Sequence, residues 1–264
     1  MVTITLSNEQ LREKYTRNMP TAFCSGCGHG TVLNAFTRAL ETIKLPAESI
    51  AVFSGIGCSG WVGPHIRADS MHTTHGRAIA FATGLKTYKP EMNVFVFTGD
   101  GDGLGIGGNH LIHAARRNID LNIILLNNGI YGMTGGQTAP TTPTGVITST
   151  ALRGNPANPF DAMELVLGAG ATYCARWTTH NARQISKSII EAVQNPGFSF
   201  IEVLSQCPTH FGRRSHLRTT ESMMDHYKAD FSQRPKEGQT KIGVFRNDRR
   251  PEFCEQLRAY KTTN

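Results

Sequence analysis

Three short runs made up mostly of apolar residues, each followed directly by a glycine-rich or polar loop, constrain the fold of this chain most. They occupy residues 50–53, 93–98 and 122–126. A strand that is apolar at nearly every position is buried on both faces, which is typical of a parallel sheet with helices on both sides. The segments between the runs space their apolar residues as helices do. The sequence therefore predicts an α/β fold with a doubly wound, mainly parallel sheet and helices on both faces.

The same patterns predict the remaining elements and the domain organisation. We expect helices over 31–44, 75–86, 160–168 and 180–194, a further helix ending near 117, strands over 171–175 and 199–204, and a long loop over 132–158. Residues 1–20 are predicted to form an N-terminal leader, and residues 21–208 the main domain. Residues 209–264 lack clear periodicity and are predicted to form a C-terminal extension that packs on this domain or on a partner subunit.

Length and charge exclude several classes of protein. A chain of 264 residues can bury a full hydrophobic core, and no apolar run reaches the roughly 18 residues that a membrane span needs. The N-terminus lacks the basic start and apolar stretch of a secretory signal, so we expect a cytoplasmic protein with no membrane segment. The net charge is +7, of which +5 lies in residues 205–264, and a basic surface attracts acidic partners. No nucleic-acid-binding motif accompanies this charge, so nucleic acid is not an expected partner.

Oxygen-bearing side chains stand where two neighbouring strands are expected to end. Asp100 lies in the sequence GDGDG after the strand over 93–98, and Asn128 follows the strand over 122–126. Ligands of a doubly wound sheet bind beyond the carboxyl ends of the strands, so these loops should converge on one site. Glycines let the backbone approach a diphosphate, and Mg²⁺ prefers oxygen ligands and bridges phosphates. The order strand–GDGD–helix–strand–NN resembles the thiamine diphosphate motif, in which Asp100, Asn128 and the main-chain carbonyl of Ile130 would hold Mg²⁺.

Four of the six cysteines are placed so that they could share one inorganic centre. Cys24 and Cys27 form a C-x2-C pair, Cys58 lies in the loop GIGCSG after the first strand, and Cys207 follows the strand over 199–204. Four thiolates fit either Zn²⁺ or an iron–sulfur cluster, and their spacing does not decide between the two. Their placement beside the diphosphate loops favours an electron carrier, because a structural zinc would explain less of the arrangement.

Together, these motifs resemble one enzyme family. The segments FCSGCGHG, GIGCSG, HTTHGRAIAFATGLK, GDGDGLGIGGNHLIHAARRN, NNGIYGMTGGQ and PTTPTG follow one another in this order within about residues 20–210. In content and order they resemble the beta subunits of 2-oxoacid:ferredoxin oxidoreductases, and SQCPTHFGRR resembles the 2-oxoglutarate branch. Because substrate choice can depend on a few pocket residues, pyruvate and branched-chain 2-oxoacids stay open as substrates.

The resemblance implies three cofactors and the residues that would hold them. The cofactors are thiamine diphosphate, Mg²⁺ and one 4Fe-4S cluster. The positions that match cluster ligands are Cys24, Cys27, Cys58 and Cys207, and those that match Mg²⁺ ligands are Asp100, Asn128 and Ile130. The positions that match contacts to thiamine diphosphate are Ile56, Gly57, Cys58, Ser59, His75, Gly101, Asp102, Gly132 and Met133. His75 is also the candidate catalytic side chain, whereas His29, His65, His72, His110 and His113 are interpreted as structural histidines.

The implied reaction needs partners. The family oxidatively decarboxylates a 2-oxoacid to its acyl-CoA and CO₂, or runs the reverse reaction, and passes electrons through the cluster to ferredoxin. The chain has room for the diphosphate-binding domain only, so the glutamate that activates the cofactor is expected from an alpha subunit in an α2β2 assembly. Two alternatives stay open: a non-oxidative thiamine diphosphate decarboxylase or synthase subunit with a structural zinc, and a basic, zinc-stabilised nucleic-acid-binding module. The GDGD…NN pattern argues against the second.

Overall fold

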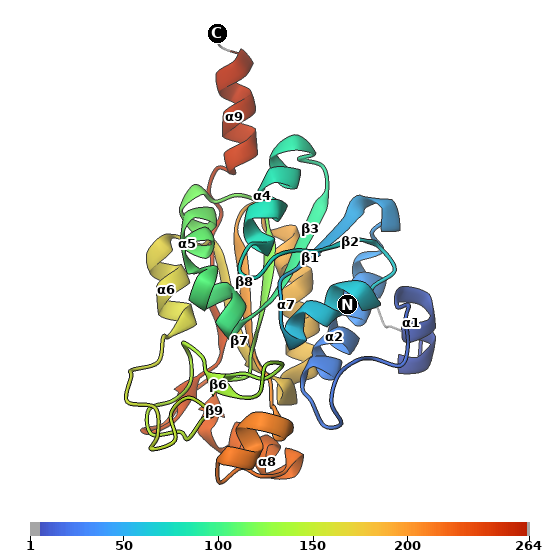
Figure 1. Cartoon of the computed structure of the whole chain (residues 1–264). Helices are drawn as coiled ribbons and strands as arrows, with labels where there is room; N and C mark the ends of the chain where they lie inside the picture. Colours follow the sequence, from blue (N-terminus) through green and yellow to red (C-terminus); the bar gives the residue numbers. More distant parts are fainter. Residues whose placement is uncertain (1–5, 263–264) are drawn as a thin grey trace.

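A seven-stranded sheet forms the centre of the computed structural model, which describes residues 6–262 (Figure 1). In spatial order the strands are β11 (Gly243–Asn247), β7 (Tyr173–Thr178), β8 (Ser199–Leu204), β4 (Asn122–Asn127), β3 (Asn93–Gly99), β1 (Ile50–Ser54) and β2 (Asp69–His72). Every neighbouring pair is parallel except β11 with β7. The predicted α/β fold with a doubly wound, mainly parallel sheet is confirmed.

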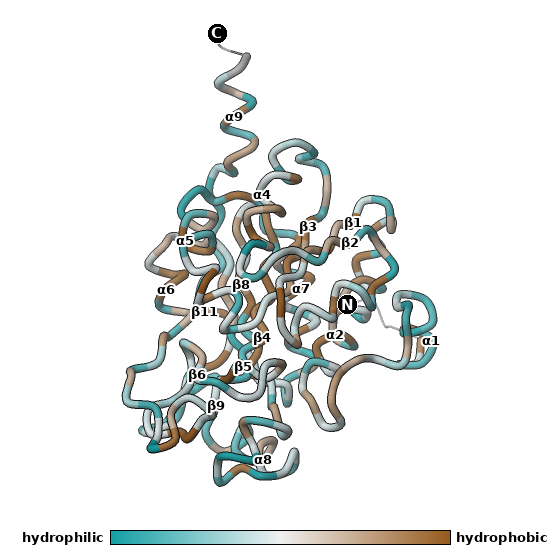
Figure 2. Tube along the Cα trace, in the orientation of Figure 1, coloured by the Kyte–Doolittle hydropathy of each residue, from teal (hydrophilic) through white to brown (hydrophobic). Residues whose placement is uncertain are grey.

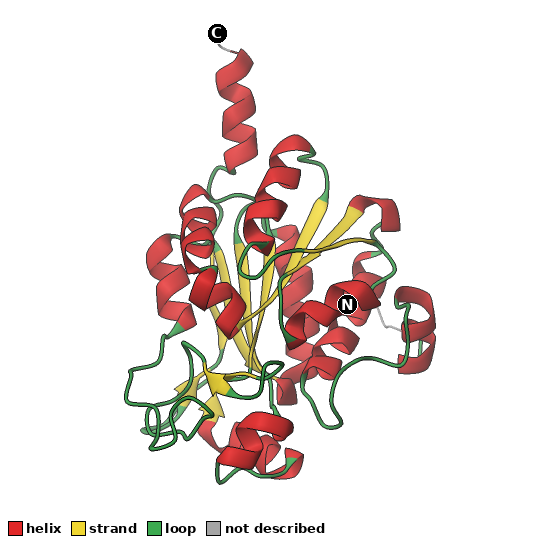
Figure 3. Ribbon diagram, viewed as in Figure 1, coloured by secondary structure: helices red, strands yellow, loops and turns green. Residues whose placement is uncertain are grey.

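Helices cover both faces of this sheet (Figure 3). One face packs against α2 (His29–Ile43) and α7 (Ala182–Gln194), and the other against α4 (Ala78–Tyr88), α5 (Gly108–Arg117) and α6 (Ala162–Ala169). Successive side chains of a strand point to opposite faces, so the apolar strands contribute to two cores.

Strand β3 illustrates how one apolar strand supplies both cores. Its Phe95 and Phe97 meet Phe36 of α2 edge-on, with ring centroids 4.9 and 5.0 Å apart. Val94 and Val96 lie in the core on the other face. Figure 2 shows hydrophobic residues concentrated in the central strands and along parts of the helices beside them.

The other elements surround this framework. They are the helices α1 (Asn8–Tyr15), α3 (Val62–His65), α8 (Thr220–Asp230) and α9 (Phe253–Thr262), and the two-residue strands β5 (Ile130–Tyr131), β6 (Gln137–Thr138), β9 (Phe231–Ser232) and β10 (Thr240–Lys241). No helix within residues 6–262 is long and apolar enough to cross a bilayer.

Besides these smaller elements, which were not predicted, the structure differs from the predictions in one of the flanking helices and in two strands of the main sheet. The helix expected to begin at residue 75 begins at Ala78, because residues 74–76 form a turn. Strand β2 was not predicted, since its sequence DSMH is polar and all four residues are exposed. Strand β11 was not predicted either, and it adds a part of the C-terminal segment to the edge of the sheet.

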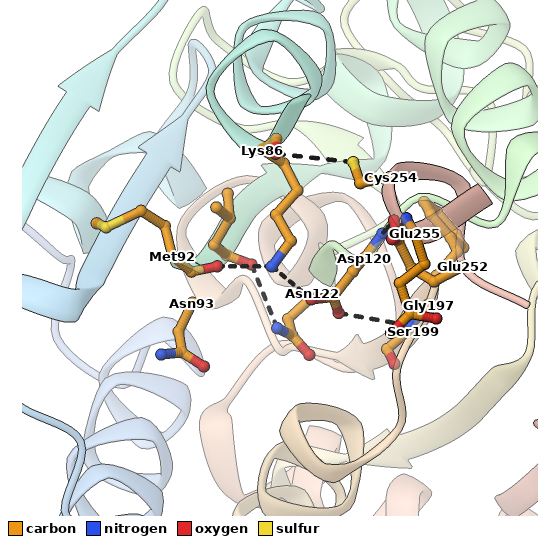
Figure 4. A network of polar contacts seen from close by, with 12 residues as sticks. Lys86, Met92, Asn93, Asp120, Asn122, Gly197, Ser199, Glu252, Cys254 and Glu255 are labelled. Atoms are coloured by element: carbon orange, nitrogen blue, oxygen red, sulfur yellow. Dashed lines mark hydrogen bonds and ion pairs between the residues drawn. The ribbon is translucent and has the colours of Figure 1, made fainter. Parts of the chain in front are cut away.

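A polar network at the amino ends of the strands holds the C-terminal segment to the main sheet (Figure 4). Buried Lys86 pairs with Asp120 at 2.5 Å and also donates to the carbonyl of Met92 at 2.7 Å. Glu252 accepts a hydrogen bond from the main-chain N–H of Asp120, and the Cys254 thiol donates to the carbonyl of Lys86. From this anchor, α9 extends away from the body of the protein (Figure 1).

Asp120→Ala is expected to lower the free energy of unfolding by about 3 kcal/mol, because it leaves the Lys86 ammonium buried without a counter-charge. Urea denaturation at pH 7 measures the change. The double variant Lys86→Met/Asp120→Ala also removes the buried ammonium of Lys86, so it should recover most of the lost free energy of unfolding. Equal destabilisation of the single and double variants would contradict this account.

Candidate active site at the carboxyl ends of the strands

The strand order reverses direction between β1 and β3, and a cavity of about 180 Å³ opens there. From β1 the chain continues outward to β2, whereas β3 and β4 follow on the other side. Such a reversal separates the loops that leave neighbouring strands, which creates a crevice for a ligand. The loops after β1, β3 and β4 line this strand-end cavity.

All twelve residues that the sequence assigned to Mg²⁺ and thiamine diphosphate line the strand-end cavity. They are Ile56, Gly57, Cys58, Ser59, His75, Asp100, Gly101, Asp102, Asn128, Ile130, Gly132 and Met133. Their convergence agrees with the expectation that the three loops meet, and their individual roles stay predictions.

Asp100 is the carboxylate best placed for a cation. Its side chain is buried, and its Oδ2 accepts a hydrogen bond from the Thr141 hydroxyl at 2.7 Å. Burial raises the pKa of Asp100 to about 6, although hydrogen bonds from Thr141 and the backbone of Gly101 act in the opposite direction. Asn128 and Ile130, which carry an amide oxygen and a main-chain carbonyl oxygen, line the same cavity, and Asn128 Oδ1 accepts a hydrogen bond from the main-chain N–H of Ile130 at 3.2 Å. This set of hard oxygen donors fits Mg²⁺.

Asp102, only two residues away, serves a different purpose. Its Oδ1 accepts hydrogen bonds from His75 Nδ1 and the main-chain N–H of Gly76, both at 2.7 Å, and from that of Ile56 at 3.2 Å. Its Oδ2 accepts one from the Thr98 hydroxyl at 2.6 Å. Asp102 therefore ties the loop after β1 and the loop before α4 to the end of β3, and it fixes the orientation of His75.

A buried polar chain supports the Asp100 side of the cavity from behind. The Thr141 hydroxyl lies 2.7 Å from Asp100 and 2.8 Å from Asn127 Oδ1, so it can donate to either one. Asn127 donates to Glu202 at 2.8 Å, and Glu202 in turn accepts from Arg176 at 2.6 Å. Because each of these groups is buried and paired, the chain holds the loop after β4 in one arrangement.

The four predicted cluster cysteines line a second cavity, of about 220 Å³, which we call the cysteine cavity. Cys24 and Cys27 reach it from the loop before α2, Cys58 from the loop after β1, and Cys207 from the end of β8. At Gly132 a Cβ would lie 3.5 Å from the sulfur of Cys58 and 3.7 Å from that of Cys207. Glycine at this position thus leaves the space between the two sulfurs open.

The electrostatics of the thiols agree with their closeness to one another. Burial raises the pKa of Cys27 to about 12, and repulsion from Cys207, Cys58 and Cys24 adds to the shift. Burial raises the pKa of Cys58 to about 11, with further contributions from Cys207 and Cys24. A cationic centre among the sulfurs would favour their thiolate forms.

A single zinc ion would require the four sulfurs to lie close together. A tetrahedral Zn²⁺ site with Zn–S bonds of about 2.3 Å holds its four sulfurs roughly 3.8 Å apart. Among the residues that the structure describes, no three His, Cys, Asp or Glu side chains are grouped so as to hold a metal ion. Four thiols line a cavity of about 220 Å³, and thiolates are ligands that suit both Zn²⁺ and an iron–sulfur cluster.

The two cavities share a wall. Cys58, Asn128, Gly132 and Met133 line both of them. A group bound in the strand-end cavity would therefore lie directly beside a group bound among the cysteines.

His29 is a functional candidate that the sequence interpretation treated as structural. Its ring is buried and lines the strand-end cavity, and its Nδ1 lies 2.8 Å from the Ser205 hydroxyl. Burial lowers the pKa of His29 to about 4, so the ring is neutral at pH 7. Tyr131 and Thr134, which also line this cavity, were missed too. The sequence CGHG does place His29 two residues after a cysteine ligand candidate, which was the one available signal.

Comparison with known proteins places these cavities in a family context. The family described as thiamine pyrophosphate enzyme, C-terminal TPP binding domain, matches residues 55–203. The 2-oxoglutarate synthase subunit KorB of Methanothermobacter marburgensis is 51% identical over 255 residues, which cover 92% of this chain and 90% of that protein. The 2-oxoacid:ferredoxin oxidoreductase subunit beta of Saccharolobus solfataricus is 40% identical over 190 residues, which cover 71% and 62% of the two chains.

A solved structure extends the similarity to three dimensions. The 2-oxoglutarate:ferredoxin oxidoreductase from Magnetococcus marinus, with 2-oxoglutarate, coenzyme A and succinyl-CoA bound, aligns with a TM-score of 0.84. It is 31% identical, and the alignment covers 96% of this chain and 90% of the other. Together with the matched thiamine diphosphate-binding domain, these similarities show that the chain belongs to the beta subunits of the 2-oxoacid:ferredoxin oxidoreductases.

Proposed function

We propose that this chain is the beta subunit of an enzyme that oxidatively decarboxylates 2-oxoglutarate to its acyl-CoA and CO₂, or runs the reverse reaction, with ferredoxin as electron partner. The observation that carries the proposal is the shared wall between the strand-end cavity and the cysteine cavity. An electron path from a 2-oxoacid to an iron–sulfur centre needs these two sites to adjoin.

The residues of the strand-end cavity suit thiamine diphosphate and Mg²⁺. Asp100, Asn128 and the carbonyl of Ile130 would hold the metal, and the main chain of Gly101 would lie against the diphosphate. When bound, thiamine diphosphate supplies the nucleophilic carbon and the electron sink that removal of CO₂ from a 2-oxoacid requires. The protein itself orients the cofactor, excludes water and holds His75 in place through Asp102.

The residues of the cysteine cavity suit one 4Fe-4S cluster, with Cys24, Cys27, Cys58 and Cys207 as its ligands. All six cysteines of the chain are free. Free thiols and a reduced cluster persist in a reducing compartment, so a cytoplasmic location is part of the proposal.

The size of the strand-end cavity supports the need for an alpha subunit. Its volume of about 180 Å³ is below the roughly 300 Å³ at which pockets begin to enclose a whole cofactor-sized ligand. We infer that a partner subunit, in an α2β2 assembly, closes over the rest of the cofactor and contributes its activating glutamate. The same subunit would supply most of the contacts to the 2-oxoacid and coenzyme A.

The experiment that tests this proposal is anaerobic co-purification of the chain with its alpha subunit. We expect about four irons and four acid-labile sulfides per chain, and turnover of 2-oxoglutarate with coenzyme A and a low-potential dye. Pyruvate and a branched-chain 2-oxoacid serve as comparison substrates. Zinc without iron or sulfide, with no electron transfer to the dye, would support the non-oxidative alternative instead.

A further inference from the structure

The segment that joins β6 to α6 lies behind the proposed cation site. Residues 139–161 contain neither helix nor strand, yet Thr141 and Thr142, in the sequence PTTPTG, are buried. No residue of PTTPTG lines the strand-end cavity. Any effect of this segment on a cation in that cavity must therefore act through the residues that do line it.

Thr141 connects the two loops that carry the proposed cation ligands. Its hydroxyl lies 2.7 Å from Oδ2 of Asp100, directly after β3, and 2.8 Å from Oδ1 of Asn127, at the end of β4. Within the described residues, no other side chain donates a hydrogen bond to Asp100. Among side chains, the Thr141 hydroxyl is therefore the group that orients this buried carboxylate.

Thr142 holds the loop after β4 from the same segment. Its hydroxyl donates to the carbonyl of Gly129 at 2.6 Å and accepts from the main-chain N–H of Ala139 at 2.8 Å. Gly129 lies between the proposed ligands Asn128 and Ile130, and its φ of +70° makes the main chain turn sharply there. Because the carbonyl of this turn is held by Thr142, the two neighbouring ligands are held as well.

The two threonines are themselves anchored. Asn155 is buried, and its side chain donates to the carbonyls of Thr142 at 2.8 Å and Ala157 at 3.2 Å. Its main chain pairs with that of Gly145 and Val146, at 2.8 Å in both hydrogen bonds. A buried polar network with its members paired is rigid. The segment can therefore act as a fixed support for the cation ligands although it has no regular secondary structure.

We propose that Thr141 and Thr142 are positioning residues that set the affinity and the selectivity of the cation site. Thr141 orients the carboxylate of Asp100, and Thr142 fixes the loop after β4. The inference rests on the proposed function, because it takes the strand-end cavity to bind Mg²⁺ with thiamine diphosphate. Residues that orient metal ligands in this way typically contribute 10- to 100-fold to metal affinity.

The identity of the cation makes this role distinguishable from a general contribution to folding. Mg²⁺ requires nearly ideal octahedral geometry with ligands at about 2.0–2.1 Å, whereas Ca²⁺ accepts six to eight oxygens at about 2.3–2.6 Å in flexible arrangements. Loss of orientation at Asp100 should therefore weaken Mg²⁺ binding more than Ca²⁺ binding. Partial unfolding of the site would weaken both to the same extent.

The test uses the complete enzyme with its alpha subunit, in excess thiamine diphosphate, and measures the Kd of Mg²⁺ and of Ca²⁺ by calorimetric titration. Thr141→Val replaces the hydroxyl by a methyl group, and it should raise the Kd of Mg²⁺ at least about 10-fold and that of Ca²⁺ by less. Thr142→Val should change both constants in the same direction. Thr141→Ser keeps a hydroxyl, so its Kd for Mg²⁺ should return close to that of the unmodified enzyme.

Thr148→Val is the matched control. Thr148 is buried in the same segment and its hydroxyl lies 2.6 Å from that of Thr138, but it lines neither the strand-end cavity nor the cysteine cavity. We expect its Kd for Mg²⁺ to be unchanged. If Thr141→Val does not fold, Thr141→Ala also removes the hydroxyl and takes its place with the same expectation.

Three results would overturn the proposal. They are an unchanged Kd for Mg²⁺ in the Thr141 variant, an equal loss in Thr148→Val, and equal losses for Mg²⁺ and Ca²⁺. In each of these cases the unmodified enzyme still binds Mg²⁺ and thiamine diphosphate, so the proposed function stands. If the unmodified enzyme bound neither of them, the proposed function would fail, and this inference would fail with it.

Discussion

Asp100→Asn is expected to weaken retention of Mg²⁺ and thiamine diphosphate by at least about 100-fold and to leave the iron–sulfur centre in place. Changes of residues that only support a metal ligand already cost 10- to 100-fold in metal affinity, and this change removes the charge of a proposed ligand itself. Asp100 lies in the strand-end cavity and does not line the cysteine cavity. The two effects should therefore separate.

The substitution should not unfold the protein. The Asp100 carboxyl is buried, and burial raises its pKa to about 6. When no cation is bound, the ionised form of this carboxyl therefore destabilises the folded protein. Asparagine has nearly the same shape, and its carbonyl can still accept the hydrogen bond that Thr141 donates. The melting temperature of the protein freed of thiamine diphosphate and Mg²⁺ is therefore expected to be unchanged or higher.

Calorimetric titration with Mg²⁺ and thiamine diphosphate, together with the visible spectrum of the cluster, measures both outcomes. Asp225→Asn is the matched control, since this aspartate is exposed on α8 and pairs with Lys228 at the surface. Full cofactor affinity and turnover in Asp100→Asn would show that the Mg²⁺ assignment is wrong.

The strands that could be predicted are those that are buried on both faces, because burial requires a recognisable run of apolar residues in the sequence. Strands β1, β3, β4 and β8 are almost wholly buried, so apolar residues fill nearly every position. Edge strands lack such a run. All four residues of β2 are exposed, and β11 pairs antiparallel with a register shift between Val244 and Arg246. Their positions depend on contacts with distant segments, which no short window of sequence contains.

The same distinction applies to the site. Residues in the loops after β1, β3 and β4 could be assigned, because parallel strands bring their carboxyl ends to one edge. His29 could not, because it enters the strand-end cavity through packing of α2 beside Ser205, which is 176 positions away. Asp102 was predicted as a cofactor contact, and the structure adds that both its oxygens are hydrogen-bonded within the protein.

Cys207→Ser is expected to remove most of the iron and acid-labile sulfide and to lower 2-oxoacid-dependent dye reduction by more than about 100-fold. A serine hydroxyl is a harder and less acidic ligand than a thiol, so the iron that Cys207 would coordinate in the proposed cluster would lose its protein ligand. Cys207 is the most informative of the four cysteines, because it lines the cysteine cavity but not the strand-end cavity, whereas Cys58 lines both.

Thiamine diphosphate binding in Cys207→Ser should therefore persist within a few-fold of the unmodified enzyme. Cys254→Ser is the matched control, because Cys254 is also buried and its thiol donates to the carbonyl of Lys86 far from both cavities. Iron, sulfide and cofactor content measured on the same anaerobic samples distinguish the two sites. If Cys207→Ser kept its full complement of iron and sulfide, the four thiols would not share a cluster. A redox reaction requires both centres to adjoin, whereas a zinc ion that only stabilises the fold requires the cysteines alone. Without a shared cluster, the redox reaction would no longer explain why the two cavities lie side by side.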